Sequence, residues 1–142
     1  PTLSFLMLFC SILPVSAQEV KTVTDNENSI TVDVTVFDVK KEKAAETAVP
    51  YLSQALFFRG LSDSFYCKSP LAGTDESFMD QHPQYFNEMF ENGRFLSFIS
   101  SSRLVSYNKK AKPKEAVVRF VVNIKALRLD LETQGVRRRF GF

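Results

Sequence analysis

Few residues in this sequence could perform nucleophilic or acid–base chemistry. It contains one histidine, His82, and two cysteines, Cys10 and Cys67. A thiol enzyme needs a cysteine activated by a base, and only Cys67 with His82 could form such a pair in the mature chain. These two residues belong to different predicted elements, and Cys67 is more simply interpreted as a small half-buried residue. A thiol enzyme is therefore a minor alternative, and one Cys with one His has no spacing typical of a metal site.

The motifs of common enzyme classes are absent from the sequence. It has no glycine-rich phosphate loop after a strand, and no G-x-S-x-G, H-E-x-x-H or C-x-x-C pattern. Asp33 and Asp38 lie on, or at the end of, the first predicted strand, where we expect them to face solvent. We therefore expect a non-enzymatic protein with no cofactor and no metal.

Basic residues are concentrated in the last third of the chain. Residues 18–93 contain 6 basic and 13 acidic residues, whereas residues 94–142 contain 12 basic and 3 acidic ones. This asymmetry predicts either attraction between two parts of one domain or a basic surface for an anionic partner. The candidate partner-binding residues lie in the segments KKAKPK and RRRFGF: Lys109, Lys110, Lys112, Lys114, Arg137, Arg138, Arg139, Phe140 and Phe142.

Three kinds of partner are compatible with these clusters. The first is a protein in the cell envelope, bound by charge steering and an aromatic anchor from the tail, with the loop at 61–73 as a further candidate surface. The second is an anionic glycan or lipid bound by the basic hairpin. Nucleic acid is a weaker alternative, because an ordinary solvated hairpin turn explains the lysines equally well and the N-terminal segment predicts secretion. The tail could instead dock on the sheet and be structural.

The N-terminal segment LSFLMLFCSILPVSAQEV predicts export. Its apolar run, residues 3–15, spans about 13 residues, whereas a helix needs about 20 to cross a bilayer. Pro14 and the small residues Ser16 and Ala17 are typical of a signal-peptide cleavage site, and polar sequence follows. A retained anchor and a buried helix are the alternatives. Because the sequence starts without Met, we expect the usual basic leader to be missing.

The expected mature chain is exported, periplasmic or extracellular, and has no transmembrane segment. Cleavage after Ala17 would remove Cys10, which lies in the middle of the apolar run and so is poorly placed for lipidation. Cys67 would then have no intramolecular disulfide partner, although export would allow one. The mature length suits a single domain over residues 29–142, preceded by a flexible lead-in over residues 18–28.

Strand and helix patterns alternate along the first half of this domain. Residues 30–36 have a β-branched residue at every second position, as in a half-buried strand. Residues 40–60 have apolar residues at helical spacing and end at Gly60. Pro50 should either kink this helix or start a second one. Residues 61–73 show no period and predict a loop.

The second half predicts a helix followed by a hairpin. An aromatic stripe over residues 78–90 indicates a core-packed helix that Pro83 kinks or restarts. Residues 94–108, with a bulge near their serines, and residues 115–129 should pair as strands on either side of the KKAKPK turn. Residues 126–134 can form a short helix. The predicted fold class is α+β: a small, mainly antiparallel sheet (β-α-α-β-β) with two helices on one face and a short C-terminal helix.

Two segments together resemble a known group of proteins. They are ALFFRGLSDS, residues 55–64, and VNIKALRLDLETQGVRRRFGF, residues 122–142. They resemble small exported proteins of uncharacterised function from Bacteroidota-type bacteria, in which an FFRGLPGS-like segment precedes a loop and an aromatic-rich helix. This chain lacks the Pro-Gly of that segment. The resemblance implies an envelope location and no activity or site residues.

Overall fold

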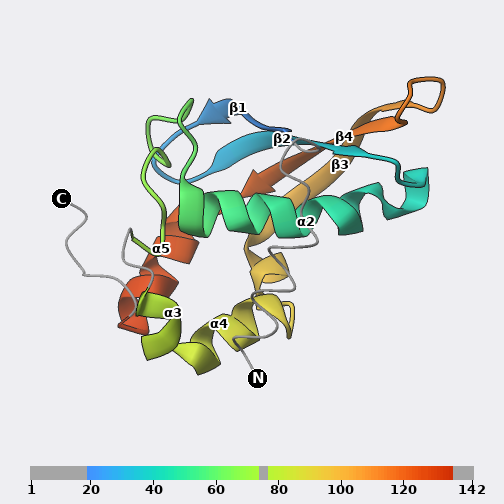
Figure 1. Ribbon diagram of the computed structural model, residues 1–142. Coiled ribbons are helices and arrows are strands. Elements are labelled where there is room, and N and C mark those ends of the chain that lie inside the picture. The colour runs from blue at the N-terminus through green and yellow to red at the C-terminus, as the bar shows by residue number, and fades with distance from the viewer. Residues whose placement is uncertain (1–18, 74–76, 136–142) are drawn as a thin grey trace.

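The computed structural model describes residues 19–73 and 77–135, except for the side chains of residues 77 and 78. It contains a four-stranded antiparallel sheet with the strand order β1-β2-β4-β3. The helices gather on one side of this sheet (Figure 1). The predicted α+β class is therefore confirmed. The strands are β1 (Glu19–Asp25), β2 (Ile30–Phe37), β3 (Ile99–Asn108) and β4 (Glu115–Val122).

The helical elements connect and cover these strands. The 3₁₀ turn η1 leads directly into α2, which continues into the π-helical turn η2. The helices α3 and α4 follow, and the 3₁₀ turn η3 precedes β3. Their bounds are η1 (Lys41–Lys43), α2 (Ala44–Gln54), η2 (Ala55–Arg59), α3 (Ser77–Gln81), α4 (Pro83–Phe90), η3 (Arg94–Phe98) and α5 (Ile124–Thr133).

The core lies between one face of the sheet and α2. β2 and β4 both alternate buried and half-buried residues, because successive side chains point to opposite faces of a strand. Val32 lies opposite Phe120 and Val34 opposite Val118, so the apolar sides of the two strands coincide. The small residues Ala44 and Ala48 are fully buried on α2 and allow the helix to lie close to these strands.

A second apolar layer joins α4 to η2. The rings of Phe57 and Phe90 meet edge to face with centroids 5.2 Å apart, and Phe95 adds a third ring at 5.9 Å from Phe57. Phe86 and Met89 are buried beside them. Such aromatic pairs stabilise by about 1 kcal/mol beyond the area that they bury. The aromatic stripe is thus part of the core over the residues that the structure describes.

The proline and glycine positions largely follow the prediction. Pro83 is the first residue of α4, where its missing N–H costs nothing, so the predicted restart is confirmed. α2 runs through Pro50 to Gln54, so no second helix begins at that proline. Gly60 follows η2 with φ +81°, a conformation that favours glycine.

The structure corrects several predicted elements. The flexible lead-in predicted over residues 18–28 is wrong for residues 19–25, which form β1 and pair with β2. Residues 94–98 form η3 rather than strand. β4 ends at Val122, because the Asn123 side chain accepts the N–H of Ala126 at 3.0 Å and caps α5. The predicted bulge in β3 is present, with register shifts between Ile99 and Ser101 and again between Leu104 and Ser106.

Within the two described ranges, no helix has the length and apolar character needed to cross a membrane. The predicted signal peptide, residues 1–17, lies outside these ranges.

Candidate functional site

The structure separates the only candidate thiol from the solvent. Cys67 is 0% exposed, its main-chain N–H donates to Ser64 Oγ at 2.9 Å, and its carbonyl accepts from Leu61 at 2.7 Å. His82 lies at the start of α4 and lines a shallow surface hollow with Arg94 and other residues, of which Cys67 is not one. A buried sulfur offers no accessible nucleophile, so this geometry does not support a Cys67–His82 pair.

The described part of the chain contains no cluster of side chains that could bind a metal ion. No group of three His, Cys, Asp or Glu side chains there is arranged to hold an ion.

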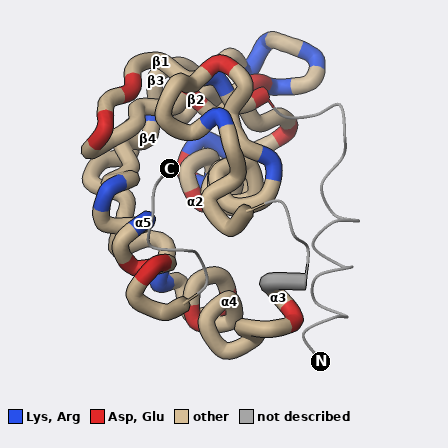
Figure 2. Tube along the Cα trace, turned by 90° about the vertical axis from the view of Figure 1, so that its left-hand side faces the viewer, with Lys and Arg blue, Asp and Glu red and all other residues tan. Residues whose placement is uncertain are grey.

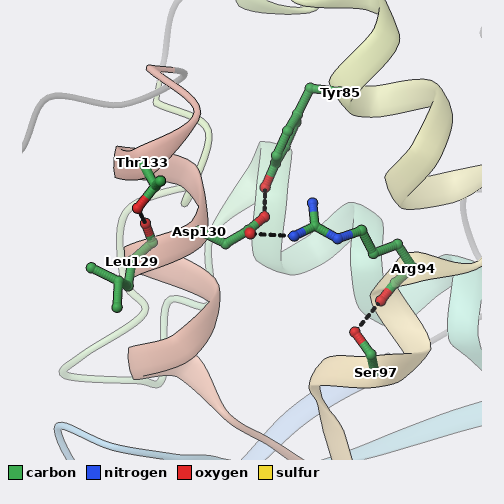
Figure 3. A network of polar contacts seen from close by, with 6 residues as sticks. All are labelled: Tyr85, Arg94, Ser97, Leu129, Asp130 and Thr133. Carbon is green, nitrogen blue, oxygen red and sulfur yellow. Dashed lines mark hydrogen bonds and ion pairs between the residues drawn. The ribbon is translucent and has the colours of Figure 1, made fainter.

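A polar network lies beside the same hollow and joins three elements. Asp130 on α5 accepts a hydrogen bond from the Tyr85 hydroxyl of α4 at 2.7 Å. It also forms an ion pair with Arg94 of η3 (Figure 3). The Arg94 guanidinium also lies 5.9 Å from the centre of the Phe98 ring. Burial, together with the hydrogen bond to Asp130 and its negative charge, raises the pKa of Tyr85 far above its ordinary value. Tyr85 therefore stays protonated and donates, and the network works as a structural clamp.

The face of the sheet opposite α2 carries a row of charges. Register places Lys21 of β1 opposite Asp33, Asp33 opposite Arg119, and Arg119 opposite Arg103 of β3. Arg119 donates from Nε and Nη2 to the two carboxylate oxygens of Asp33, at 2.7 and 2.9 Å. This hydrogen bond is the main cause of the raised pKa of Arg119. Asp33 lies on the face away from α2, as predicted, but it is engaged in an ion pair rather than only solvated.

The loop over residues 61–73 is held in place by side chains from β1. One oxygen of Asp25 accepts from Ser64 Oγ at 2.7 Å, from the Phe65 N–H at 2.9 Å and from the Tyr66 N–H at 3.1 Å. In the opposite direction, Asp63 of the loop accepts from the N–H and the hydroxyl of Thr22, at 2.8 and 2.7 Å. Hydrogen bonds to the carboxylates of Asp25 and Asp63 thus attach the loop to the edge of the sheet.

A third contact attaches the loop to α5. Arg128 of α5 donates from Nη2 to the carbonyl of Tyr66. The loop is therefore bound to the sheet and to α5, although it has no regular secondary structure of its own.

Phe65 projects from this fixed loop into solvent. Its side chain is 83% exposed, the largest value among the exposed large apolar residues of the described chain. The Phe65 and Tyr66 rings meet edge to face, with their centroids 5.0 Å apart. Val23, the extra residue of the β1 bulge next to Thr22, is also exposed. An aromatic side chain held on an ordered backbone and left outside the core is the arrangement of a binding anchor.

The predicted basic hairpin is present between β3 and β4. Asn108 Oδ1 accepts the N–H groups of Lys110 and Ala111, both at 3.1 Å, and so shapes the turn. The four predicted lysines lie together on it and are all exposed: Lys109, Lys110, Lys112 and Lys114. The predicted tail residues Arg137, Arg138, Arg139, Phe140 and Phe142 lie outside the residues that the structure describes.

Three lysines that the sequence analysis did not single out lie beside this hairpin. The Asp38 N–H donates to the Lys114 carbonyl at 2.9 Å, which joins the end of β2 to the base of the hairpin. The chain then passes through exposed lysines into α2. We call the combined surface the lysine-rich end; it consists of Lys40, Lys41, Lys43, Lys109, Lys110, Lys112 and Lys114. Figure 2 shows the hairpin as a basic loop that projects from the body.

The KKEK run preceding the helix was the available sequence signal for this larger surface. Its position beside the hairpin depends on the pairing of β2 with β4, which joins residues more than 80 positions apart. Phe65 had no such signal, since exposure of one aromatic in a loop follows from the contacts of its neighbours.

Comparisons of this chain with protein-family models, with curated proteins and with solved structures find no match.

Proposed function

We propose that this protein is a non-enzymatic module of the cell envelope that binds a protein partner through its 61–73 loop, with Phe65 as the anchor. The observation that carries the proposal is the contrast between the exposed Phe65 ring and its fixed backbone. An aromatic ring in water gains free energy when a partner buries it. Residues of this type contribute a large share of the binding energy in protein interfaces.

The fixed backbone of the loop supports the same proposal through entropy. Ordering a loop during binding costs free energy that would be subtracted from the affinity. Here Asp25, Asp63 and Arg128 hold residues 63–66 through contacts within this chain. The loop therefore presents Phe65 in a preorganised state.

The envelope location rests on the sequence. The apolar segment with a small-residue cleavage site supports export, and so does the resemblance of residues 55–64 and 122–142 to small exported proteins. The tail over residues 137–142 is proposed as a second contact with the partner. Its deletion should weaken capture of the partner while leaving the thermal midpoint unchanged; a deletion variant that fails to fold would mean that the tail is structural.

The test compares two exposed apolar side chains, one in the loop and one outside it. Phe65→Ser removes the anchor, whereas Leu96→Ser removes a side chain that is 56% exposed on η3 and outside the loop. Each variant and the wild type are cross-linked in envelope extracts, the captured proteins are identified by mass spectrometry, and the affinity for a purified candidate is measured. We expect Phe65→Ser to weaken binding at least tenfold and Leu96→Ser to leave it within twofold.

Two results would overturn this proposal. Equal affinities for the wild type and Phe65→Ser would place the interface elsewhere. Equal losses in both serine variants would indicate a general effect of surface polarity or stability rather than a specific anchor. Circular dichroism of each variant verifies that the fold is intact.

A further inference from the structure

The lysine-rich end combines two segments that are distant in the sequence. Its hairpin carries Lys109, Lys110, Lys112 and Lys114, and its second segment carries the lysines around η1, residues 40–43. The hydrogen bond from Asp38 to Lys114 and the pairing of Phe37 with Glu115 hold the two segments together. They share the end of the molecule farthest from the 61–73 loop (Figure 1).

These charges are weakly compensated in the described structure. The ion pair at this end joins Lys43 to Glu46 at 3.2 Å, with side chains that are 66% and 73% exposed. Exposed pairs of this kind contribute little free energy. Four acidic residues share this end with the seven lysines, which leaves a net charge of +3: Asp38, Glu42, Glu46 and Glu115.

The positions of two of these lysines are unfavourable for the helix that they precede. Lys40 and Lys43 occupy the N-cap positions of η1 and α2, and neither makes a side-chain capping hydrogen bond. Helix starts favour Ser, Thr, Asp or Asn at this position, and the partial positive charge of the helix dipole repels a cation there. Because η1 continues directly into α2, these two lysines lie at one helical start, and a local rule broken there is consistent with a function for this surface.

The side chains at this end fit a flat, phosphate-rich surface better than a sugar chain. Lysines are flexible point charges that suit many phosphates without fixed geometry, whereas sugar sites usually need a flat aromatic face. The nearest tyrosine on β3, Tyr107, is half-buried and donates its hydroxyl to the carbonyl of Val39 at 3.2 Å. No large apolar residue of the hairpin turn, residues 109–114, is exposed for insertion into a bilayer.

We propose that the lysine-rich end binds the anionic headgroup surface of a phospholipid membrane. Each lysine close to such a surface adds attraction, and the attraction is screened by salt within a Debye length. Binding is electrostatic and peripheral, without penetration of the hydrocarbon layer.

This docking would orient the molecule. α2 and η2 together run from Ala44 to Arg59, and at a rise of 1.5 Å per residue they span about 24 Å. The lysines of residues 40–43, which belong to the lysine-rich end, precede this span, and the 61–73 loop follows it. If the loop binds a protein, as proposed above, Phe65 faces away from the lipid and towards a partner.

The test is co-sedimentation with lipid vesicles, using the protein purified as the cell processes it. Vesicles of phosphatidylcholine alone are compared with vesicles that contain about one third phosphatidylglycerol, at low and high salt. The variant Lys109→Gln/Lys110→Gln/Lys112→Gln is compared with Lys21→Gln/Lys68→Gln/Lys125→Gln, which removes three exposed lysines elsewhere. We expect the hairpin variant to lower partition into anionic vesicles at least tenfold and the control variant to lower it less than threefold.

Several outcomes would overturn the membrane proposal. They are equal partition of the wild type into neutral and anionic vesicles, equal losses in both lysine variants, and partition unchanged by salt. Binding to dextran sulfate without binding to anionic vesicles would instead identify a soluble polyanion as the ligand.

The membrane proposal and the partner proposal can fail independently. Phe65→Ser leaves every lysine in place and should not change vesicle binding. The hairpin variant leaves the 61–73 loop unchanged and should retain capture of a protein partner in solution.

Discussion

The carboxylate of Asp25 accepts the main-chain N–H of Phe65 at 2.9 Å, while the Phe65 side chain is 83% exposed. The same oxygen also accepts from Ser64 and Tyr66, so one acidic side chain at the end of β1 fixes three consecutive residues of the loop. The backbone of the exposed aromatic is therefore held by the sheet, while its side chain lies outside the core.

Replacing Asp25 with alanine should loosen the loop without unfolding the domain. The variant leaves the buried Ser64 hydroxyl and two N–H groups without their acceptor. We expect the free energy of unfolding to fall by about 1–3 kcal/mol, the cost of one unsatisfied buried group, because the Ser64 hydroxyl is buried whereas water can replace the acceptor of the exposed Phe65 N–H. Hydrogen exchange should accelerate at the amides of Phe65 and Tyr66. Glu27→Ala, an exposed acid in the following turn, is the control and should change neither quantity.

Acid should weaken the same attachment. The Ser64 hydroxyl, followed by the N–H groups of the loop, lowers the pKa of Asp25 below 3.8. Burial raises the pKa of Asp63, but the hydrogen bonds from Thr22, together with the main-chain N–H of Asp63 and the charge of Lys21, outweigh it, so the pKa of Asp63 is also lowered. A lowered pKa in the folded state stabilises the protein above the unfolded value, and this stabilisation is lost as the pH falls through the folded value.

The thermal midpoint of the wild type should therefore be steady above about pH 5 and fall progressively towards pH 3 and below. In the double variant Asp25→Asn/Asp63→Asn this acid-dependent part should be smaller, although the midpoint at neutral pH is lower. Circular dichroism melts between pH 2.5 and pH 7 measure both curves. Parallel curves for the wild type and the double variant would show that other groups control acid stability.

The sequence predicted those elements whose signals are local. The alternation in residues 30–36, the restart at Pro83 and the turn at KKAKPK each follow from residues a few positions apart, and the structure confirms all three. β1 was missed because it is an edge strand with only a weak alternation of exposure and mostly polar side chains. Its pairing depends on β2 and on Asp63, 41 residues from its partner Thr22, rather than on its own pattern.

The candidate surfaces divide in the same way. The hairpin lysines were identified from composition, because a lysine run between two strand patterns predicts an exposed turn. The combination of a held backbone and an exposed side chain at Phe65 was not predicted, since it depends on Asp25, 40 residues away, which accepts from the Phe65 N–H. The Tyr85–Asp130 hydrogen bond, across 45 residues, was missed for the same reason.

Asp130 should be more important for stability than the tyrosine that it binds. Tyr85→Phe removes one hydroxyl and should cost about 1 kcal/mol. Asp130→Ala leaves both the Tyr85 hydroxyl and the Arg94 guanidinium without their acceptor. Because the Arg94 side chain is 38% exposed, water compensates in part, and we expect a loss of about 2 kcal/mol rather than the 3–5 typical of a fully buried pair. Urea unfolding of both variants measures the difference, and equal losses would contradict this account.

Gly60 should tolerate substitution less well than Gly93 or Gly135. Its φ is +81°, and a Cβ there would lie 2.3 Å from the carbonyl oxygen of Lys68, which is main chain and cannot rotate away. Gly60→Ala should therefore displace the 61–73 loop and lower the thermal midpoint strongly. The loss in the free energy of unfolding should exceed the cost of about 1–2 kcal/mol of a left-handed alanine alone. Gly135→Ala has nearly the same φ, +75°, with nothing within 4 Å, and isolates that backbone cost. Similar melting points for both alanine variants would mean that the loop moves away from the clash easily.

The thiol of Cys67 should react only when the protein opens. Its side chain is 0% exposed, and reagents attack an accessible thiolate. In a Cys10→Ser background, which leaves Cys67 as the reporting thiol, Ellman's reagent should react at least a hundredfold more slowly in buffer than in 8 M urea. His82→Ala should leave the native rate unchanged, provided that its melting point is unchanged. A fast native reaction that His82→Ala slows would instead identify an activated thiol, and the minor alternative of a thiol enzyme would replace the binding module.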